Sequence, residues 1–334
     1  MRPYTDYLHW LASQDQDGAL HVWKEYLAGA EPTMATVGNS KVARIPEQLT
    51  HELPVEHTAA LEDTIRNSGL TLSNLVQCMW AILLARLSGR EDVVFGVTMS
   101  GRPAELLGIE KTPGFFINTV PMRVQLERGE PLGKLLSRVQ ANQAQMIPVQ
   151  HTGLTDIQRG IGLEKLFDTV IIFENYPLDR VALAKPVGGL RLAHAEMHDA
   201  SHYPVALAAV PGERLHLRFD YDPGCFTADE IRALAMRYVR LLEQGGSHLD
   251  TPWQQISFIT PEERAQVLEE FNPWREVPVR PSTLPDLFER AAERSRDSVA
   301  VLFEGQQLSY AQLNARANQW ARVLAGMGDR KSVV

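Results

Sequence analysis

Cysteine is scarce in this sequence. Cys78 and Cys225 are the two cysteines among 334 residues, and they lie far apart in the chain. Two such residues can build neither a disulfide framework nor a Cys-x-x-Cys metal site. A reducing compartment is the default environment for such a composition, so we expect a cytoplasmic protein.

The sequence also lacks an excess of basic residues and a long apolar run. Lys and Arg number 33 against 41 Asp and Glu, and the formal net charge is -8. Nucleic acids and anionic membranes attract clustered basic residues, so neither is expected as a partner. The longest apolar run, VQCMWAILLARL at 76–87, is interrupted by Gln77 and Arg86 and is too short to span a bilayer. The N-terminus has no signal-peptide core, and the sequence predicts a soluble protein.

Several catalytic motifs are absent as well. There is no Gly-x-Ser-x-Gly elbow and no Gly-x-x-x-x-Gly-Lys-Ser/Thr loop, which argues against an α/β-hydrolase and a P-loop nucleotide site. The Gly-Gly-Ser in LEQGGSHLD lacks the residue that separates glycine from serine in a phosphopantetheine attachment motif. A loop is the favoured interpretation of that stretch.

Three histidines have the spacing of metal ligands. His194, His198 and His202 are four residues apart and would share one face of a helix. Pro204 and the lack of an acidic catalytic partner favour a loop or strand surface over a zinc site. His198 or His202, beside Asp199, could instead act as a general base. We favour a hydrogen-bonded structural histidine at a strand entrance.

Apolar periodicity predicts a mixture of helices and strands. Leu20, Trp23 and Leu27 form one stripe before Gly29, so a helix is expected over 4–28. Further helices are expected at 57–67, from Thr71 or Ser73 to before Gly89, at 131–148 and at 227–244. Buried strands are expected around 93–97, at 115–126 and in 166–177, and a hairpin over 203–222 with its turn at Pro211-Gly212.

The composition divides the chain into three parts. Residues 1–250 form one mixed helix–strand domain of α/β class, an α+β sandwich. Residues 251–283 read as a linker, because NPWREVPVRPSTLP at 272–285 carries four prolines. Residues 284–334 begin a new pattern: a helix at 284–297, strands near 299–309 around Glu304-Gly305, and a helix at 309–326. This last part is too short to bury an independent core comfortably, and we expect it to be the start of a longer domain.

The stretch GFFINTVPMRV, residues 114–124, is an apolar strand with polar residues at its centre. With a period of two, Phe115, Ile117 and Thr119 face one side, while Phe116 and Asn118 face the other. Proline cannot donate a ladder hydrogen bond, so Pro121 predicts an edge strand, a bulge, or a strand that leaves its sheet. Asn118 and Thr119 then supply partners for irregular backbone or line the path of a polar substrate.

Five stretches, in this order, resemble the condensation domain of non-ribosomal peptide synthetases. They are PYTDYLHW (3–10), DVVFGVTMSGRPAELLGIEKTPGFFINTVPMRV (92–124), HTGLTDIQ (151–158), LFDTVIIFENYP (166–177) and HDASHYPVAL (198–207). Further along, LSYAQLNARANQWARVLAGMG (308–328) resembles the first core motif of the adenylation (AMP-binding) domain, and FITPEERAQVLEEFN (258–272) resembles the usual linker before it.

The resemblance implies a chloramphenicol acetyltransferase-like fold with two α/β lobes that face each other across a tunnel. In this family, a His-His-x-x-x-Asp-Gly motif in the N-terminal lobe positions or deprotonates the acceptor amine, which attacks the donor thioester. This sequence has no His-His pair. We therefore expect the C-terminal lobe alone, followed by the truncated N-terminal start of an adenylate-forming domain, in a fragment that is inactive by itself.

The resemblance also implies candidate residues for the tunnel wall or the lobe junction. These are Arg102, Phe116, Asn118 and Thr119, with Arg102 either structural or in contact with pantetheine. No catalytic residue and no metal ligand is expected in this chain.

The implied cofactor is phosphopantetheine carried by partner carrier domains, and ATP would bind only to a complete adenylation domain. The implied partners are the N-terminal lobe, peptidyl carrier domains and the rest of the adenylation domain. Two alternatives stay open: a non-catalytic carrier-docking lobe, and a lobe of an epimerization domain. The adenylation-like segment downstream argues against the latter, because epimerization domains usually end a module.

Overall fold

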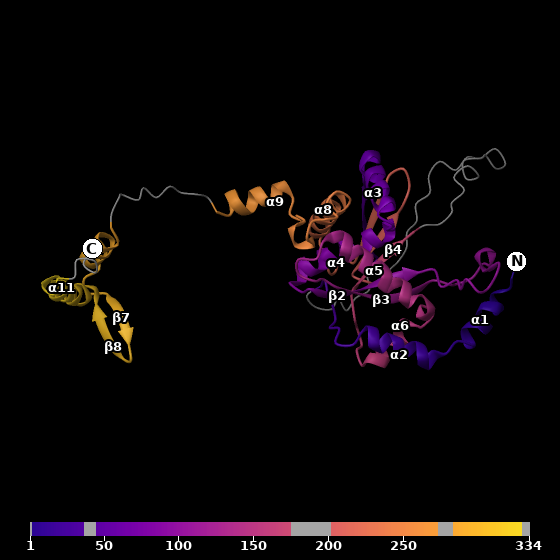
Figure 1. Ribbon diagram of the computed structural model, residues 1–334, viewed down its shortest axis with the longest axis horizontal. Coiled ribbons are helices and arrows are strands. Elements are labelled where there is room, and N and C mark those ends of the chain that lie inside the picture. Colours follow the sequence, from indigo (N-terminus) through magenta and orange to yellow (C-terminus); the bar gives the residue numbers. More distant parts are fainter. Residues whose placement is uncertain (1, 37–44, 175–201, 273–282, 329–334) are drawn as a thin grey trace. The chain divides into compact units, whose positions relative to one another are not determined.

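A six-stranded sheet forms the centre of the first of two compact units in this computed structural model (Figure 1). The structure describes residues 2–36, 45–174, 202–272 and 283–328. The first unit is Met1–Ala265 and the second is Gln266–Val334. The mixture of helices and strands confirms the predicted α/β class.

The strands follow the order β1-β6-β5-β4-β2-β3, so β1 and β3 are the edges of the sheet. β4 pairs in parallel with β2 and β5, and the other neighbours are antiparallel. The bounds are β1 Glu47–Glu52, β2 Asp92–Met99, β3 Asn118–Gln125, β4 Thr169–Phe173, β5 Val205–Val210 and β6 His216–Tyr221. The antiparallel β5–β6 pair confirms the predicted hairpin, and the position of β3 confirms the predicted edge strand.

Helices cover both faces of this sheet, and Figure 1 shows α2 and α6 on the side opposite α3 and α8. The main core lies between the sheet and α3, α4, α5 and α8, and a second core lies under α2 and α6. The bounds are α1 Tyr4–Ala12, α2 Gln16–Tyr26, α3 Val55–Asn67, α4 Leu72–Ser88, α5 Leu132–Met146, α6 Leu154–Ile161, α8 Ala228–Gly245 and α9 Pro261–Ala265. Short 3₁₀ turns occupy Ile109–Lys111, Ile147–Val149 and Trp253–Gln255.

The apolar run at 76–87 lies inside α4, where nearly every side chain is buried against the protein core. Thr71 caps the start of α4 by accepting a hydrogen bond from the Asn74 amide, and Gly89 ends it in a left-handed conformation, as predicted. No single helix in the described residues is long and apolar enough to cross a membrane; α3 and α4 meet that test only as a pair bent by 103°.

The helix predicted over 4–28 is two helices, which corrects that expectation. α1 ends at Ala12, and the Asp15 carboxylate then caps α2 by accepting the Gly18 amide at 2.9 Å. An Asp side chain that competes for helical amides favours a new helix start over helix continuation. Trp23 and Leu27 are buried as the apolar stripe predicts.

The strand predicted at 115–126 starts later, at Asn118. Residues 114–117 leave the sheet because the Phe116 side chain packs against α1 instead of the main core. Alternation over this stretch alone could not show that change, since loop and strand both carry apolar side chains here.

Residues 251–256 pack onto the rest of the first unit. Trp253 and Ile256 are buried in the main core, and the Leu132 amide donates to the Thr251 carbonyl at 2.9 Å. Residues 251–265 of the predicted linker therefore belong to the first unit. Residues 273–282 of the predicted linker lie outside the described residues, so that part stays a prediction. The burial of Trp253 and Ile256 cannot be read from composition.

The second unit contains a hairpin between two helices, as predicted. The elements are α10 Leu284–Arg294, β7 Val299–Phe303, β8 Gln306–Ser309 and α11 Tyr310–Gly326, and a π-helical turn at Gln266–Glu270 precedes them. Glu304 and Gly305 form the turn with positive φ values of 46° and 79°. Apolar side chains on β7 and on α11 are exposed, including Phe303 at 68% and Trp320 at 66%.

Candidate functional site

Three of the four predicted site residues lie together where β3 begins. The Phe116 ring is buried between α1 and the loop 100–117, at 4.8 Å from the Tyr7 ring and 5.2 Å from the Tyr4 ring, both in edge-to-face geometry. Such pairs add to the free energy gained by burial itself. We call this group the Phe116 cluster; its members are Tyr4, Tyr7, Trp10, Arg102, Phe116, Asn118 and His151.

Arg102 closes the cluster from the loop side. Its guanidinium lies 4.0 Å from the centre of the Phe116 ring, and its Nη1 donates to the carbonyls of Ile109 at 2.7 Å and Thr112 at 2.9 Å. No described carboxylate pairs with it. Arg102 thus holds the loop in place and keeps a positive charge at the cluster.

Two glycines allow this packing. A Cβ on Gly101 would lie 2.2 Å from the Phe116 carbonyl oxygen, and one on Gly114 would lie 2.2 Å from the Tyr4 ring. The absence of a side chain at Gly101 lets two segments of the loop approach each other, and its absence at Gly114 lets the loop approach α1.

Asn118 fixes the turn at 150–152. Its Nδ2 donates to the carbonyls of Gln150 at 2.7 Å and Thr152 at 2.9 Å. His151 lies between these two residues, with its ring 5.7 Å from Trp10 and its Nδ1 3.1 Å from the Pro148 carbonyl oxygen. The Nε2 of His151 and the Oγ1 of Thr152 are buried without a hydrogen-bond partner among the described residues.

Thr119, the fourth predicted residue, stands opposite Thr98 in the β2–β3 register and is partly exposed. Its side chain makes no hydrogen bond within the described part of the chain, so it borders the Phe116 cluster without joining it. Tyr4, Tyr7 and the turn at 150–152 were not predicted as site residues. Tyr4 and Tyr7 lie in PYTDYLHW, and His151 and Thr152 lie in HTGLTDIQ. These stretches carry the family resemblance, and that was the signal available.

The loop 100–117 exposes apolar side chains next to the cluster. Leu107 is 80% exposed, Phe115 79% and Ile117 47%. The loop is nevertheless held by α1 and the residues just before it. Tyr4 Oη donates to the Phe115 carbonyl at 2.6 Å, and Arg2 Nε donates to the Leu107 carbonyl at 2.6 Å. A held loop with exposed apolar groups is typical of a contact surface.

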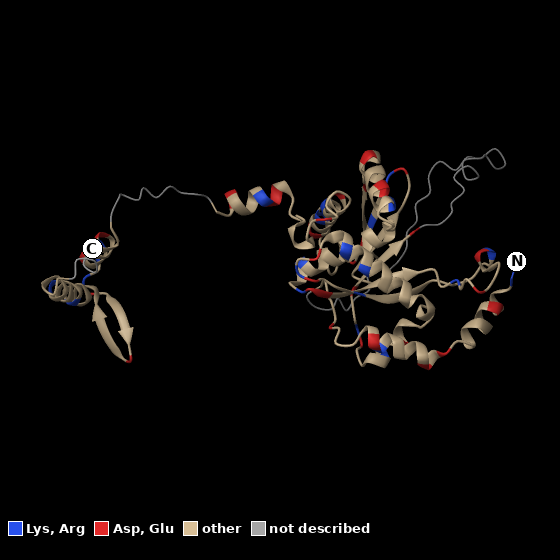
Figure 2. Cartoon of the chain, viewed as in Figure 1, with Lys and Arg blue, Asp and Glu red and all other residues tan. Residues whose placement is uncertain are grey.

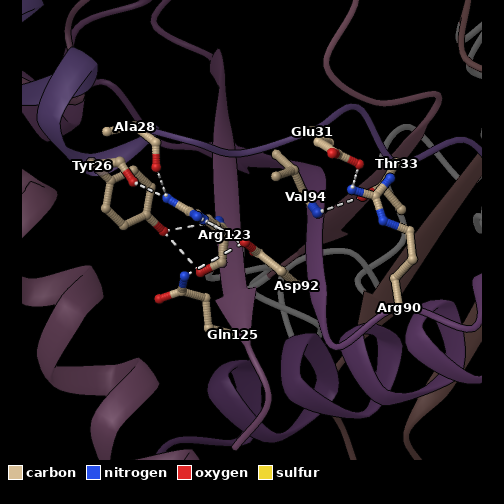
Figure 3. Close-up of polar contacts among 9 residues, drawn as sticks. All are labelled: Tyr26, Ala28, Glu31, Thr33, Arg90, Asp92, Val94, Arg123 and Gln125. Carbon is tan, nitrogen blue, oxygen red and sulfur yellow. Dashed lines mark hydrogen bonds and ion pairs between the residues drawn. The ribbon is translucent and has the colours of Figure 1, made fainter.

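The outer edge of β3 is closed by side chains (Figure 3). The Tyr26 hydroxyl accepts the Arg123 amide at 2.8 Å and donates to the Arg123 carbonyl at 3.1 Å. These two groups point away from β2. Because main-chain direction alternates along a strand, the nitrogen of Pro121 points to the same outer edge, where a ladder hydrogen bond is not required. This placement explains how an apolar strand of the sheet tolerates Pro121.

The Arg123 side chain holds the end of α2 against that edge. It pairs with Asp92 at 2.7 Å and donates from Nη1 to the carbonyls of Tyr26 at 3.1 Å and Ala28 at 2.9 Å. The hydrogen bond to Asp92 raises the pKa of Arg123, and burial raises the pKa of the Tyr26 phenol, so one group stays charged and the other neutral.

A second set of contacts continues along the chain from α2 (Figure 3). Arg90 donates to the Pro32 carbonyl at 2.8 Å and pairs with Glu31 at 2.7 Å, and Thr33 Oγ1 accepts the Val94 amide at 2.9 Å. The residues between α2 and position 36 are thereby held along the sheet.

The Phe116 cluster combines aromatic rings with one guanidinium, one amide and one imidazole. Burial, with a further contribution from Tyr4, raises the pKa of the Tyr7 phenol, which stays protonated near neutral pH. Figure 2 shows positive and negative residues interspersed along the helices of the first unit. No group of three or more potential metal ligands occurs in the residues that the structure describes. His194, His198 and Asp199 lie outside those residues, and His202 packs on Tyr203 with 4.2 Å between ring centres.

Comparisons with known proteins show the family and the fold of this chain. A family model described as "Condensation domain" matches residues 1–268. Bacitracin synthase 3 of Bacillus licheniformis is 32% identical over 342 residues, which cover 100% of this chain and 5% of that protein. Surfactin synthase subunit 3 of Bacillus subtilis (strain 168) is 33% identical over 339 residues, which cover 100% of this chain and 26% of that protein. The chain thus spans a small part of either relative.

Solved structures share the fold at lower identity. One is a four-domain nonribosomal peptide synthetase bound to AMP and glycine. Its alignment covers 94% of this chain and 25% of the synthetase chain, with a TM-score of 0.67 and 15% identity. The first condensation domain of the calcium-dependent antibiotic synthetase, in complex with a substrate analogue, matches 77% of this chain and 56% of its own, with a TM-score of 0.65 and 19% identity.

Proposed function

Because this chain belongs to the condensation-domain family of non-ribosomal peptide synthetases, we propose that it is part of an elongation module of such a synthetase. In this role it contributes to the domain that forms an amide bond between carrier-bound aminoacyl or peptidyl thioesters. The observation that carries the proposal is the family match over residues 1–268, within which three of the resembling stretches meet at the Phe116 cluster.

We assign the first unit to the C-terminal lobe of that domain. The solved condensation domain is matched over 56% of its length, which supports a share of about one lobe. The His-His-x-x-x-Asp-Gly motif is absent from the sequence, so the residues that handle the acceptor amine would come from the N-terminal lobe. The chain alone would then be inactive in condensation.

The exposed apolar residues beside the Phe116 cluster are the proposed contact with that N-terminal lobe. Leu107, Phe115 and Ile117 offer apolar area on a loop that α1 already holds in place. Burying such side chains stabilises a complex without a large ordering cost. Phe116 and Asn118 would keep the adjacent tunnel wall rigid, and Thr119 would face the tunnel.

Phosphopantetheine reaches this site on carrier domains, and Arg102 is the proposed contact for it. Arg102 is positively charged and has no described carboxylate partner, so it could contact the phosphate or the amides of phosphopantetheine. Its hydrogen bonds to two carbonyls favour a mainly architectural role. When bound, phosphopantetheine would supply an activated thioester, and residues of this chain would orient that thioester.

The second unit is the proposed start of an adenylation domain. Both relatives align with 100% of this chain, beyond the 268 residues of the condensation match. The exposed Phe303 and Trp320 would be covered by the rest of that domain. ATP would bind only when the domain is complete.

Binding to a separately produced N-terminal condensation lobe tests the proposal. We expect saturable binding that Phe115→Ser weakens at least tenfold, because the buried ring is lost from the interface. Phe271→Ser is the matched control, since Phe271 is also exposed, at 67%, and lies outside the cluster. Binding that both variants retain equally would contradict the proposed contact, and binding of a loaded carrier without the N-terminal lobe would favour a carrier-docking role instead.

A further inference from the structure

The two edges of the six-stranded sheet differ in how their main-chain groups are used. On β3, Tyr26 occupies both outer groups of Arg123, Arg138 Nη2 donates to the Gln125 carbonyl at 2.7 Å, and Pro121 has no amide to offer. Closing an edge in this way blocks the addition of another strand. The opposite edge, β1, lacks these contacts among the described residues.

The direction of each β1 residue follows from its pairing with β6. The Leu53 amide donates to the Leu215 carbonyl at 3.0 Å, so the main-chain groups of Leu53 point toward β6. Main-chain direction alternates along a strand, so the main-chain groups of His51, Leu49 and Glu47 point toward β6 as well. Gln48, Thr50 and Glu52 therefore point their amides and carbonyls outward. All three residues are exposed, and no described residue hydrogen-bonds to their main chain.

Prolines bracket this open segment. Pro46 precedes β1 and Pro54 follows it, and neither has an amide to donate. Pro54 is the residue before α3, and its carbonyl already accepts the Thr58 amide at 2.9 Å. The two prolines lie four residues before and four residues after Thr50, so the open window is symmetric about that residue. A strand related by a two-fold axis at Thr50 would place proline opposite proline and lose no hydrogen bond to either one.

We propose that the outer edge of β1 is an interface for a second copy of this chain, which adds its own β1 in antiparallel orientation with the two-fold axis at Thr50. Thr50 then opposes Thr50 of the second copy, and Gln48 opposes Glu52 of the second copy. Each of these pairs exchanges two main-chain hydrogen bonds, because all the residues in them point outward. The pairing is isologous and closed.

Side chains are compatible with this register. Opposing Thr–Thr and Gln–Glu pairs hydrogen-bond favourably, and Leu49 opposes His51, so no two like charges face each other directly. A shift by two residues in either direction sets a proline opposite one of the three open residues and loses hydrogen bonds. A larger shift, with the axis at Glu52, opposes two glutamates.

Register-specific crosslinking tests the proposal. In a Cys225→Ser background, Thr50→Cys places two thiols directly opposite each other, and a mild copper oxidant should join them into a covalent dimer. Gln48→Cys is the matched control, since residue 48 opposes residue 52 and its thiol has no partner. Crosslinking of both variants to the same extent, or of neither, would overturn the register.

Sedimentation of the full chain gives the second readout. We expect the apparent mass to rise from 37.4 kDa toward twice that value with increasing concentration. Thr50→Pro removes an outward amide and should abolish the rise, while Thr50→Val keeps the amide and should retain it. A chain that stays monomeric at every concentration, or that associates equally with Pro at position 50, would refute the interface.

Discussion

At the scale of single residues, the Phe116 cluster depends on side chains that satisfy main-chain groups. Asn118 donates hydrogen bonds to two carbonyls of the turn at 150–152. Arg102 donates hydrogen bonds to two carbonyls of its own loop and packs over the Phe116 ring. These contacts give each polar residue a definite place in an apolar setting. They explain why polar residues occur in the middle of an apolar stretch.

Asn118→Asp should destabilise the first unit. The carboxylate cannot donate to the carbonyls of Gln150 and Thr152, and it places negative charge against both oxygens. The expected loss is about 1–3 kcal/mol in the free energy of unfolding, measured in urea at neutral pH. Thr119→Ala is the neighbouring control and should stay within about 0.5 kcal/mol, because the Thr119 side chain makes no described hydrogen bond. Equal losses for the two variants would argue against the role given to Asn118.

At the scale of elements, the sequence predicted existence and type better than boundaries. α4, α8, the β5–β6 hairpin and the edge position of β3 follow from apolar periodicity, caps and one proline. The break between α1 and α2 follows from the Asp15 cap, which the apolar stripe alone does not reveal. The late start of β3 depends on the packing of Phe116 against Tyr4 and Tyr7, about a hundred residues away in the chain, which a local pattern does not contain. The candidate residues Arg102, Phe116 and Asn118 came from a family resemblance, and their shared contacts became visible only in three dimensions.

Substitutions that remove or introduce proline can test which main-chain amides of β3 point toward β2 and which point to the outer edge. Pro121→Ala should change the free energy of unfolding by no more than about 0.5 kcal/mol, because the new amide faces an outer edge. Met122→Pro removes an amide that points to β2 and should cost about 3 kcal/mol or more. Chemical unfolding of both variants gives the comparison. If Pro121→Ala were as harmful as Met122→Pro, the outward direction of residue 121 would be wrong.

The stability that Glu263 contributes at the start of α9 should decrease in acid. Burial raises the pKa of Glu263. Hydrogen bonds from Arg237 and from the Thr260 amide lower it by a larger amount, so the net shift of the pKa is downward. A carboxylate with a depressed pKa in the folded state stabilises that state above its unfolded pKa, and the contribution is lost as pH falls through the folded value. The pair is partly exposed, so the expected contribution is at most about 1 kcal/mol.

Glu263→Gln should therefore remove a small part of the stability at pH 7 and none at pH 2. Unfolding in urea at the two pH values measures this difference against the unsubstituted chain. A variant that loses as much stability at pH 2 as at pH 7 would show that Glu263 acts through packing and not through its charge.

At the scale of the whole molecule, the chain combines a folded lobe with a second unit that exposes much of its apolar surface. The first unit has a main core and two smaller ones, whereas the hairpin and α11 of the second unit leave Val299, Phe303 and Trp320 exposed. Large exposed apolar groups on a small unit indicate that further protein covers them. This contrast is what the proposed assignment, a condensation lobe followed by the start of another domain, leads us to expect.

The most direct test of the account is amide formation from loaded carriers, measured by mass spectrometry. Three samples are compared: this chain alone, this chain joined to an N-terminal lobe that carries the His-His-x-x-x-Asp-Gly motif, and carriers without added protein. The account predicts dipeptidyl product only with the joined lobes, and a lower rate when Asn118 is replaced by Asp in the joined protein. Product formed by this chain alone, above the rate seen without added protein, would contradict the assignment as a C-terminal lobe that lacks the amine-handling residues.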